Sequence, residues 1–189
     1  MTGKTHRILG LVAGGSYLIF SSEPSYQPAT FGAVLVFSYF ASLIPDLDQP
    51  TAEIWNNLPF GHLAGEAVDP FFKHRNLSHS LLGFGIFGFL FYLLINSFPS
   101  YWGINRDIVL FAFLISYLSH LLADIFTVEG IPLLYPWKKM LGIPPKPFDG
   151  IRIETGKWFE NLVIFPLLNI FLLIIVIVNW EKIKNFLLK

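Results

Sequence analysis

Stretches without a charged residue divide this chain more clearly than any motif does. Asp, Glu, Lys and Arg are absent from five of them: Ile8–Ser22, Pro24–Pro45, Asn76–Asn105, Ile108–Ala123 and Asn161–Trp180. A helix needs about 20 apolar residues to cross the hydrocarbon core of a bilayer. In Asn161–Trp180, sixteen of the twenty residues are apolar. The pattern therefore predicts membrane-spanning helices rather than the alternation of a soluble sheet.

The fold class predicted from this pattern is all-α, a polytopic membrane bundle of about five transmembrane helices. The expected spans are Ile8–Ser22, Thr30–Ile44, Leu81–Ser97, Ile108–Phe126 and Asn161–Trp180. We expect a single membrane-embedded domain over residues 1–189, with long connections at about 45–78 and 127–160. Five prolines favour extended structure in the second connection. Gly83, Gly85 and Gly88 would let helices approach closely.

Lysine and arginine counts predict the orientation, because cytoplasmic loops carry an excess of both. With a cytoplasmic N-terminus, nine lie inside and four outside. The inner ones are Lys4, Arg7, Lys73, Arg75, Lys138, Lys139, Lys146, Arg152 and Lys157, and the outer ones are Arg106, Lys182, Lys184 and Lys189. We therefore expect a multi-pass protein of the cell membrane with its N-terminus in the cytoplasm. The lysines of the tail disagree with the scheme and leave open whether the last helix fully crosses.

The amino-acid composition limits the partners and the metal ligands that this chain can have. Hydrophobic residues make up 53% and charged residues 14%, against roughly 25% charged in an average soluble domain. The 13 basic residues balance 13 acidic ones, so no basic field is available for nucleic acid. The chain has no Cys. A metal must therefore be held by His, Asp or Glu.

Eight such residues fall at the predicted cytoplasmic helix ends. His6 precedes the first span, Asp46 and Asp48 follow the second, His74 and His79 open the third, His120 and Asp124 close the fourth, and Glu160 opens the fifth. The spacing of His120 and Asp124 places both on one helix face. Ionisable residues inside an apolar segment are costly and usually functional.

Imidazole and carboxylate groups are good ligands for Zn, Mn or Fe. Eight candidates exceed the four ligands of one tetrahedral zinc, so we expect one to three divalent ions per chain. Such ions activate water and clamp phosphate oxygens, and Arg75 would bind an anionic substrate. We predict a hydrolase acting on a phosphoester. A lipid or amphiphilic substrate is favoured, with membrane lipids as partners and the oligomeric state undetermined.

Other interpretations of the same residues remain open. The carboxylates at 46 and 48 would also serve as helix caps, and His120 with Asp124 would also form a structural hydrogen bond. The eight residues would then form a structural hydrogen-bonded cluster, a plug of polar groups, in a non-catalytic membrane protein. A metal transporter or sensor and a haem protein are further alternatives. A transporter, however, would place its ligands near the bilayer midplane.

The motifs together resemble those of the YdjM family of bacterial and archaeal membrane proteins. They are Thr5-His6, Ile44-Pro45-Asp46-Leu47-Asp48, His74-Arg75-Asn76-Leu77-Ser78-His79-Ser80, Ser119-His120 through Asp124 to Thr127, and Gly130-Ile131-Pro132-Leu133-Leu134-Tyr135-Pro136. The chain departs from the family pattern at Gln49, Asn76 and Ser78. At position 49 the departure removes one possible ligand.

The resemblance implies an inner-membrane metal-dependent hydrolase, distantly similar to zinc-dependent phospholipase C and related zinc nucleases. The metal ligands that it implies are His6, Asp46, His74, His79, His120 and Asp124. It leaves Asp48 and Glu160 as ligands, as carboxylates that orient a ligand, or as the general base. Arg75 is the implied contact to the substrate anion.

Overall fold

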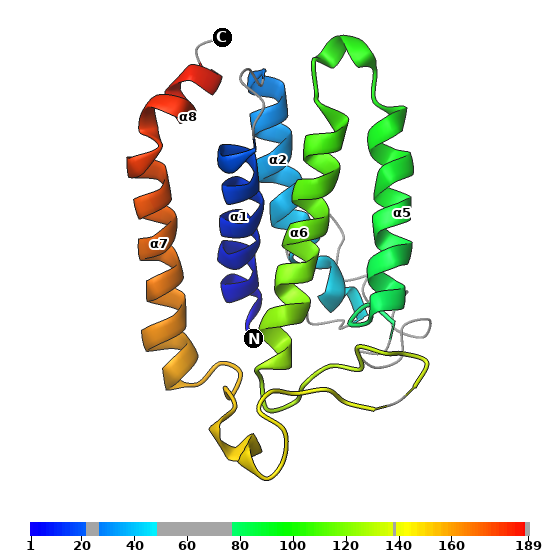
Figure 1. Cartoon of the computed structure of the whole chain (residues 1–189), viewed down its shortest axis with the longest axis vertical. Coiled ribbons are helices and arrows are strands. Elements are labelled where there is room, and N and C mark those ends of the chain that lie inside the picture. Colours follow the sequence, from blue (N-terminus) through cyan, green and yellow to red (C-terminus); the bar gives the residue numbers. More distant parts are fainter. Residues whose placement is uncertain (22–26, 49–76, 138, 188–189) are drawn as a thin grey trace, which may run out of the picture.

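The computed structural model describes residues 1–21, 27–48, 77–137 and 139–187, and these form an all-α protein (Figure 1). Five long helices run side by side in alternating directions: α1 (Gly3–Phe20), α2 (Pro28–Ala41), α5 (Leu81–Ser97), α6 (Arg106–Ile125) and α7 (Phe165–Val178). A π-helical turn, η4 (Glu160–Ile164), leads into α7. The short helix α8 (Trp180–Leu187) turns across the end of the bundle that lies farthest from the N-terminus.

Helix α6 lies at the centre of the bundle and packs against α1, α2 and α5. Its residues Val109, Ala112, Tyr117 and Leu121 are completely buried. The Phe113 ring stacks on Phe91 of α5 at a centroid distance of 3.9 Å. This central position explains why the face of α6 that carries His120 and Asp124 is buried.

The contact between α1 and α2 is close because small residues face each other. A Cβ atom built on Gly10 would overlap the Ser42 side chain, and one built on Gly14 would overlap Ser38 Oγ and lie 2.8 Å from Ser116 Oγ. The Ser116 hydroxyl donates a hydrogen bond to the Gly10 carbonyl at 2.9 Å. Small residues four apart on each helix allow this approach.

The predicted helices are confirmed as elements, but several bounds differ. Helix α2 ends at Ala41 rather than Ile44, and the span predicted over Asn161–Trp180 is η4 followed by α7, with α8 beginning at Trp180. Helix α5 has the predicted bounds, and Ser80 caps it by accepting a hydrogen bond from Gly83 N–H at 3.1 Å. The prediction that His6 precedes the first helix is wrong. Helix α1 begins at Gly3, so His6 lies in its first turns. Lys4, His6 and Arg7 interrupt the apolar pattern without interrupting the helix.

The outer surface of the bundle is apolar. Along α7 only Ile175 is buried, and most of the other side chains on that helix are exposed. Within the part of the chain that the structure describes, two helical stretches are long and apolar enough to cross a membrane, Arg106–Ile125 and Glu160–Val178, while α2 and α5 are apolar but shorter. An exposed apolar surface of this kind marks contact with lipid or protein. That all five helices cross a membrane stays a prediction.

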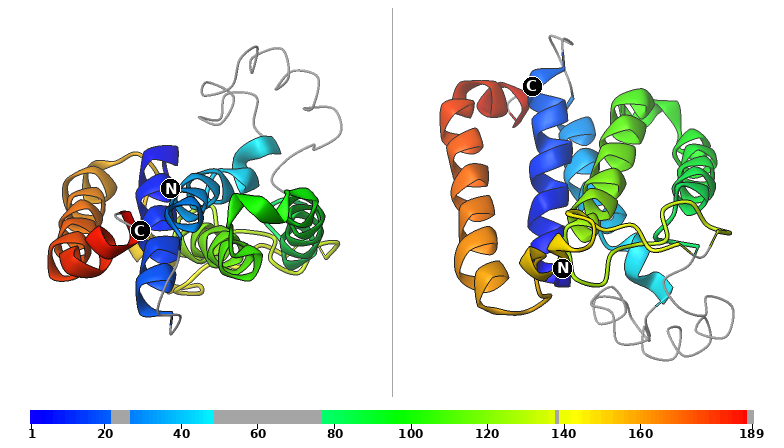
Figure 2. Two further views of the ribbon diagram at one scale, coloured as in Figure 1. Left: turned by 90° about the horizontal axis from the view of Figure 1, so that it is seen from above. Right: turned by 60° about the horizontal axis from the view of Figure 1, so that its bottom comes forward.

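The segment after α6 packs beneath the bundle at the end where α1 begins (Figure 2). It contains two isolated β-bridges, Thr127 with Ile153 and Ile131 with Leu141, and the short 3-10 helix η3 (Phe148–Ile151). The described residues of this segment form turns and bridges rather than an α-helix, which agrees with the prediction from its prolines that helix is disfavoured. The backbone of this segment also reaches α5, because Leu81 N–H donates to the Leu133 carbonyl at 2.9 Å. The interior of the predicted connection at 45–78 lies outside the described residues.

Candidate metal centre

Five side chains from four parts of the chain meet at the end of the bundle where α1 begins. His6 comes from α1, Asp46 from the 3-10 helix η1 (Ile44–Asp48), and His79 from the turn before α5. His120 and Asp124 come from the last turns of α6. We call these five residues the His/Asp cluster. Helix α1 begins, α2 and α6 end, and α5 begins at this level, which is why their terminal residues converge (Figure 1).

The cluster contains two sets of possible metal ligands that share His120. One set is His6, His120 and Asp124, and the other is Asp46, His79 and His120; within each set the ligand atoms lie within 4.8 Å of one another. The Nε2 atoms of His79 and His120 are 3.3 Å apart. Two imidazole nitrogens at this separation, with carboxylates around them, suit a shared cation.

The carboxylates bridge between the imidazoles. Asp124 Oδ1 lies 3.2 Å from His6 Nε2, and its Oδ2 lies 3.6 Å from His79 Nε2 and 3.5 Å from His120 Nε2. Asp46 Oδ1 lies 3.5 Å from His79 Nε2 and 3.8 Å from His120 Nε2. The i,i+4 spacing of His120 and Asp124 therefore does place both side chains at one site, as the sequence indicated.

The orientation of His120 is fixed by the backbone. Its Nδ1–H donates to the Ser42 carbonyl at 2.6 Å, so the lone pair of Nε2 points into the cluster. Metal-binding histidines commonly have such a partner on their other nitrogen, which sets the tautomer. The His120 ring also stacks on His6 with centroids 3.5 Å apart.

The turn that carries His79 is held by α6. The Tyr117 hydroxyl donates to the Ser78 carbonyl at 2.6 Å. The Ser78 hydroxyl lies 3.4 Å from His79 Nδ1. Neither Tyr117 nor the Ser42 carbonyl could have been chosen from the sequence, because both act on the cluster through tertiary contacts.

The cluster is buried and rich in ionisable groups. His6, His79 and His120 have no exposed surface, and Asp124 has almost none. Burial raises the pKa of the Asp46 carboxyl, but the imidazoles of His120 and His79 outweigh burial and hold that pKa below its usual range. The amino group of Met1 contacts Asp124. Charges at this depth are stable only when they are paired.

His6 provides a test of whether these residues fit a metal. Its Nε2 lies near Asp124 but is not aligned for a hydrogen bond, and neither ring nitrogen has a hydrogen-bond partner among the described residues although both are buried. An unsatisfied buried polar group costs about 1–3 kcal/mol. A metal ion would satisfy such a nitrogen, and the His and Asp donors are those that Zn, Mn and Fe accept. The cluster therefore fits a divalent metal.

Glu160 is buried in a different environment. Thr2 N–H, the Thr2 hydroxyl and the Thr5 hydroxyl all donate to Oε1, at 2.6–2.7 Å, and Gly156 N–H donates to Oε2 at 2.7 Å. These hydrogen bonds join the start of α1 to the start of η4. Glu160 is not in either set of ligands among the described residues. Glu154, on the same segment before η4, is exposed.

Three predicted site residues cannot be placed relative to the cluster. His74 and Arg75 lie outside the described residues, and so does the side chain of Asp48, although its backbone ends η1. Of the six predicted ligands, the structure therefore brings five together.

The fold and the cluster define the class of this protein: an all-α protein with an apolar outer surface and a buried His/Asp cluster that can hold a metal ion. The chain belongs to the YdjM inner membrane protein family, whose model matches residues 1–184.

Individual relatives agree with this assignment. The chain is 34% identical to the inner membrane protein YdjM of Escherichia coli (strain K12) over 146 residues, 76% of this chain and 70% of the relative, and equally similar to YdjM of Shigella flexneri. It is 29% identical to the protein YvsG of Bacillus subtilis (strain 168) over 164 residues, 87% of this chain and 88% of the relative. No solved structure matches the chain.

Proposed function

We propose that this protein is a metal-dependent hydrolase of the inner membrane that cleaves a phosphoester in a lipid or amphiphilic substrate. The observation that carries the proposal is the meeting of three imidazoles and two carboxylates at one level of an apolar bundle. The proposed metal is zinc, with Mn and Fe as alternatives, at one to three ions per chain. The proposed topology has five spans and a cytoplasmic N-terminus.

A divalent metal held by the cluster lowers the pKa of water and polarises phosphoryl oxygens. The residues of the chain supply its geometry. His120 offers Nε2 to both ligand sets because the Ser42 carbonyl fixes its tautomer. Asp124 and Asp46 neutralise positive charge, and the buried surroundings strengthen each interaction. Arg75 is proposed to bind the substrate anion.

Asp48 and Glu160 have separate roles in the proposal. Asp48 is proposed as a ligand, as a carboxylate that orients an imidazole, or as the general base. The hydrogen bonds of Glu160 to Thr2, Thr5 and Gly156 support a role in holding the start of α1, and with it His6, in place.

Metal content measured by mass spectrometry on detergent-purified protein tests the proposed metal binding. Wild type is expected to hold at least one divalent ion per chain. His120→Ala should lose it, because both ligand sets include His120. Ser119→Ala is the matched control, since its hydroxyl donates to the Ser116 carbonyl at 2.7 Å and is not among the possible ligands, and it should keep the metal. A folded wild type without metal would contradict the metal site and favour a hydrogen-bonded plug.

Hydrolysis of bis(p-nitrophenyl) phosphate and of phospholipid vesicles tests the proposed phosphoesterase activity. Chelation should abolish turnover and zinc should restore it, while His120→Ala stays at least a hundredfold less active. A protein that keeps its metal but hydrolyses neither substrate would favour a metal transporter or sensor instead.

A further inference from the structure

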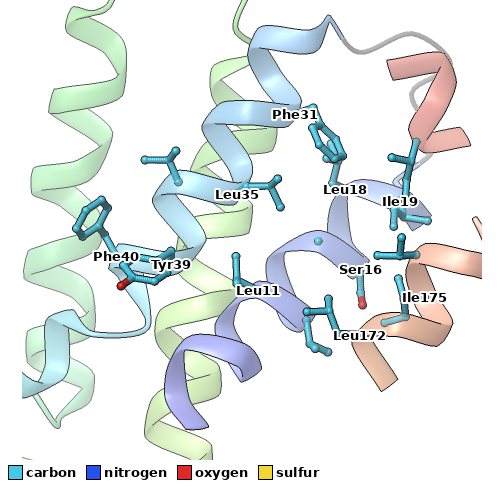
Figure 3. Close-up of a pocket in the computed structure, with 15 residues that line it drawn as sticks. Leu11, Ser16, Leu18, Ile19, Phe31, Leu35, Tyr39, Phe40, Leu172 and Ile175 are labelled. Carbon is cyan, nitrogen blue, oxygen red and sulfur yellow. The ribbon is translucent and has the colours of Figure 1, made fainter. Parts of the chain in front are cut away.

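An apolar groove runs along the side of the bundle, on residues that the His/Asp cluster does not use. Its volume is about 600 Å³, and α1, α2, α7 and α8 line it (Figure 3). Helix α7 packs against α1, and α8 packs against α2, so the space lies between α2 and α7. None of the five cluster residues lines it. The volume is in the range of a specific small-molecule site, about 300–1,000 Å³.

The walls of the groove are almost wholly hydrocarbon. They include Leu11 and Leu18 of α1, Leu35 of α2, and Leu172 of α7 (Figure 3). Gly15 of α1 also lines the groove, and a Cβ atom built there meets no other atom within 4 Å. The absence of a side chain at Gly15 therefore leaves open space in the groove.

The two ends of the groove differ. At the end away from the cluster, Ile183 of α8 closes it, and Lys182 holds α8 in place by donating to the Ile19 carbonyl at 2.8 Å. At the other end, Tyr39 lines the groove and its hydroxyl accepts a hydrogen bond from Arg7 Nη1 at 3.3 Å. Ile19 also lines the groove, so each end has a cation beside a residue of the wall: Lys182 beside Ile19 and Arg7 beside Tyr39.

A second cation, Lys4, lies near Arg7 at this end of the groove. Lys4 is one turn before Arg7 on α1, and its Nζ lies 5.0 Å from the centre of the Phe165 ring at the start of α7. Two cations therefore flank α1 where α7 begins and α2 ends. Basic side chains at the level of the headgroups attract anionic lipids. An apolar groove that ends at two cations matches an anionic amphiphile in both shape and charge.

We propose that this groove binds one acyl chain of an anionic phospholipid, with the phosphate of that lipid beside Arg7 and Lys4. The chain of the lipid lies along α1 past Gly15 and ends against α8. This site is separate from the His/Asp cluster, so it holds a resident lipid rather than the substrate. The inference goes beyond the proposed hydrolase and does not depend on it.

Native mass spectrometry of delipidated protein in a mild detergent tests the site. The protein is titrated with dioleoyl phosphatidylglycerol and, separately, with dioleoyl phosphatidylcholine. Wild type is expected to bind one phosphatidylglycerol and to prefer it to phosphatidylcholine. Arg7→Gln and Lys4→Gln should each weaken phosphatidylglycerol binding about fivefold, the effect of one basic residue near a lipid headgroup, and weaken phosphatidylcholine binding less, because its choline offsets the charge of the phosphate.

Two glycine variants separate the groove from the rest of the surface. Gly15→Phe fills the groove without backbone overlap and should abolish binding of both lipids. Gly32→Phe on α2 is the matched control, because a Cβ there also meets no atom within 4 Å and Gly32 does not line the groove. It should bind both lipids as wild type does. Circular dichroism and metal content are recorded for every variant, so loss of fold or of the metal is distinguished from loss of lipid.

Three results would overturn the proposal. The first is equal lipid binding by Gly15→Phe and Gly32→Phe. The second is equal affinity of wild type for the two lipids. The third is a dimer that Gly15→Phe dissociates, which would assign the groove to a second copy of the chain. A wild type without metal would count against the hydrolase alone, since the lipid titration is read separately.

Discussion

Glu160 shows how a buried carboxylate near a candidate metal centre can be fully engaged elsewhere. It accepts hydrogen bonds from Thr2, Thr5 and Gly156 and has no exposed surface. Glu160→Gln keeps the shape but replaces one acceptor oxygen with a donor, which cannot accept from Gly156 N–H. We expect a loss of about 1–3 kcal/mol of unfolding free energy, seen as a lower Tm by circular dichroism.

The metal content of Glu160→Gln separates two roles for this residue. If Glu160 holds α1 in place, the variant is less stable but keeps its metal at saturating zinc. The exposed neighbour provides the control, because Glu154→Gln should change neither property. Complete loss of metal from a folded Glu160→Gln protein would instead make Glu160 a ligand.

Helix packing gives a sharper test, because two adjacent glycines in α1 have opposite surroundings. Gly14 faces Ser38 and Ser116, with no room for a Cβ atom, whereas a Cβ on Gly15 meets open space. Gly14→Ala should therefore lower the Tm in detergent. Gly15→Ala should keep or raise it, since Ala favours a helix by about 1 kcal/mol over Gly. Equal effects of the two substitutions would show that α1 and α2 are not in close contact at Gly14.

The elements themselves were largely predictable, and their contacts were not. The lack of charges located the helices because apolar length is the dominant signal in such a chain. Helix α1 was the exception, since Lys4, His6 and Arg7 hide its first turns. The sequence also indicated Gly83, Gly85 and Gly88 for close helix contacts. Gly88 lies against Leu114 of α6 and Gly83 against the turn before α5, whereas a Cβ atom on Gly85 would meet no atom within 4 Å. The close approach of α1 and α2 is instead at Gly10 and Gly14.

The candidate site was predictable for a related reason. His120 and Asp124 are one turn apart, so helical geometry alone joins them, and alternating helix directions bring the ends of α1, α2, α5 and α6 to one level. Glu160 was different. Its partners Thr2 and Thr5 are more than 150 positions away, and no periodicity encodes a contact at that separation.

The two ends of the whole bundle are chemically distinct, and this predicts how it sits in the membrane. The His/Asp cluster and the segment after α6 occupy one end, and η2 (Ser100–Trp102) and α8 occupy the other. The excess of Lys and Arg on the cluster side predicts that this side is cytoplasmic. The short amphipathic α8, with Ile183 buried and Lys184 exposed, is then an interfacial helix on the outer surface. The tail lysines would lie there without preventing α7 from crossing.

Because the chain has no Cys, single cysteine substitutions report this topology directly. A membrane-impermeant maleimide added to intact spheroplasts should label Ser100→Cys and Glu181→Cys but not Lys157→Cys, and lysis should make all three reactive. Ser100, Glu181 and Lys157 are exposed, so accessibility depends on the side of the membrane. Labelling of Lys157→Cys alone would mean the opposite orientation. Labelling of Ser100→Cys without Glu181→Cys would mean that α7 does not cross, and the apolar surface of that helix would then need another partner.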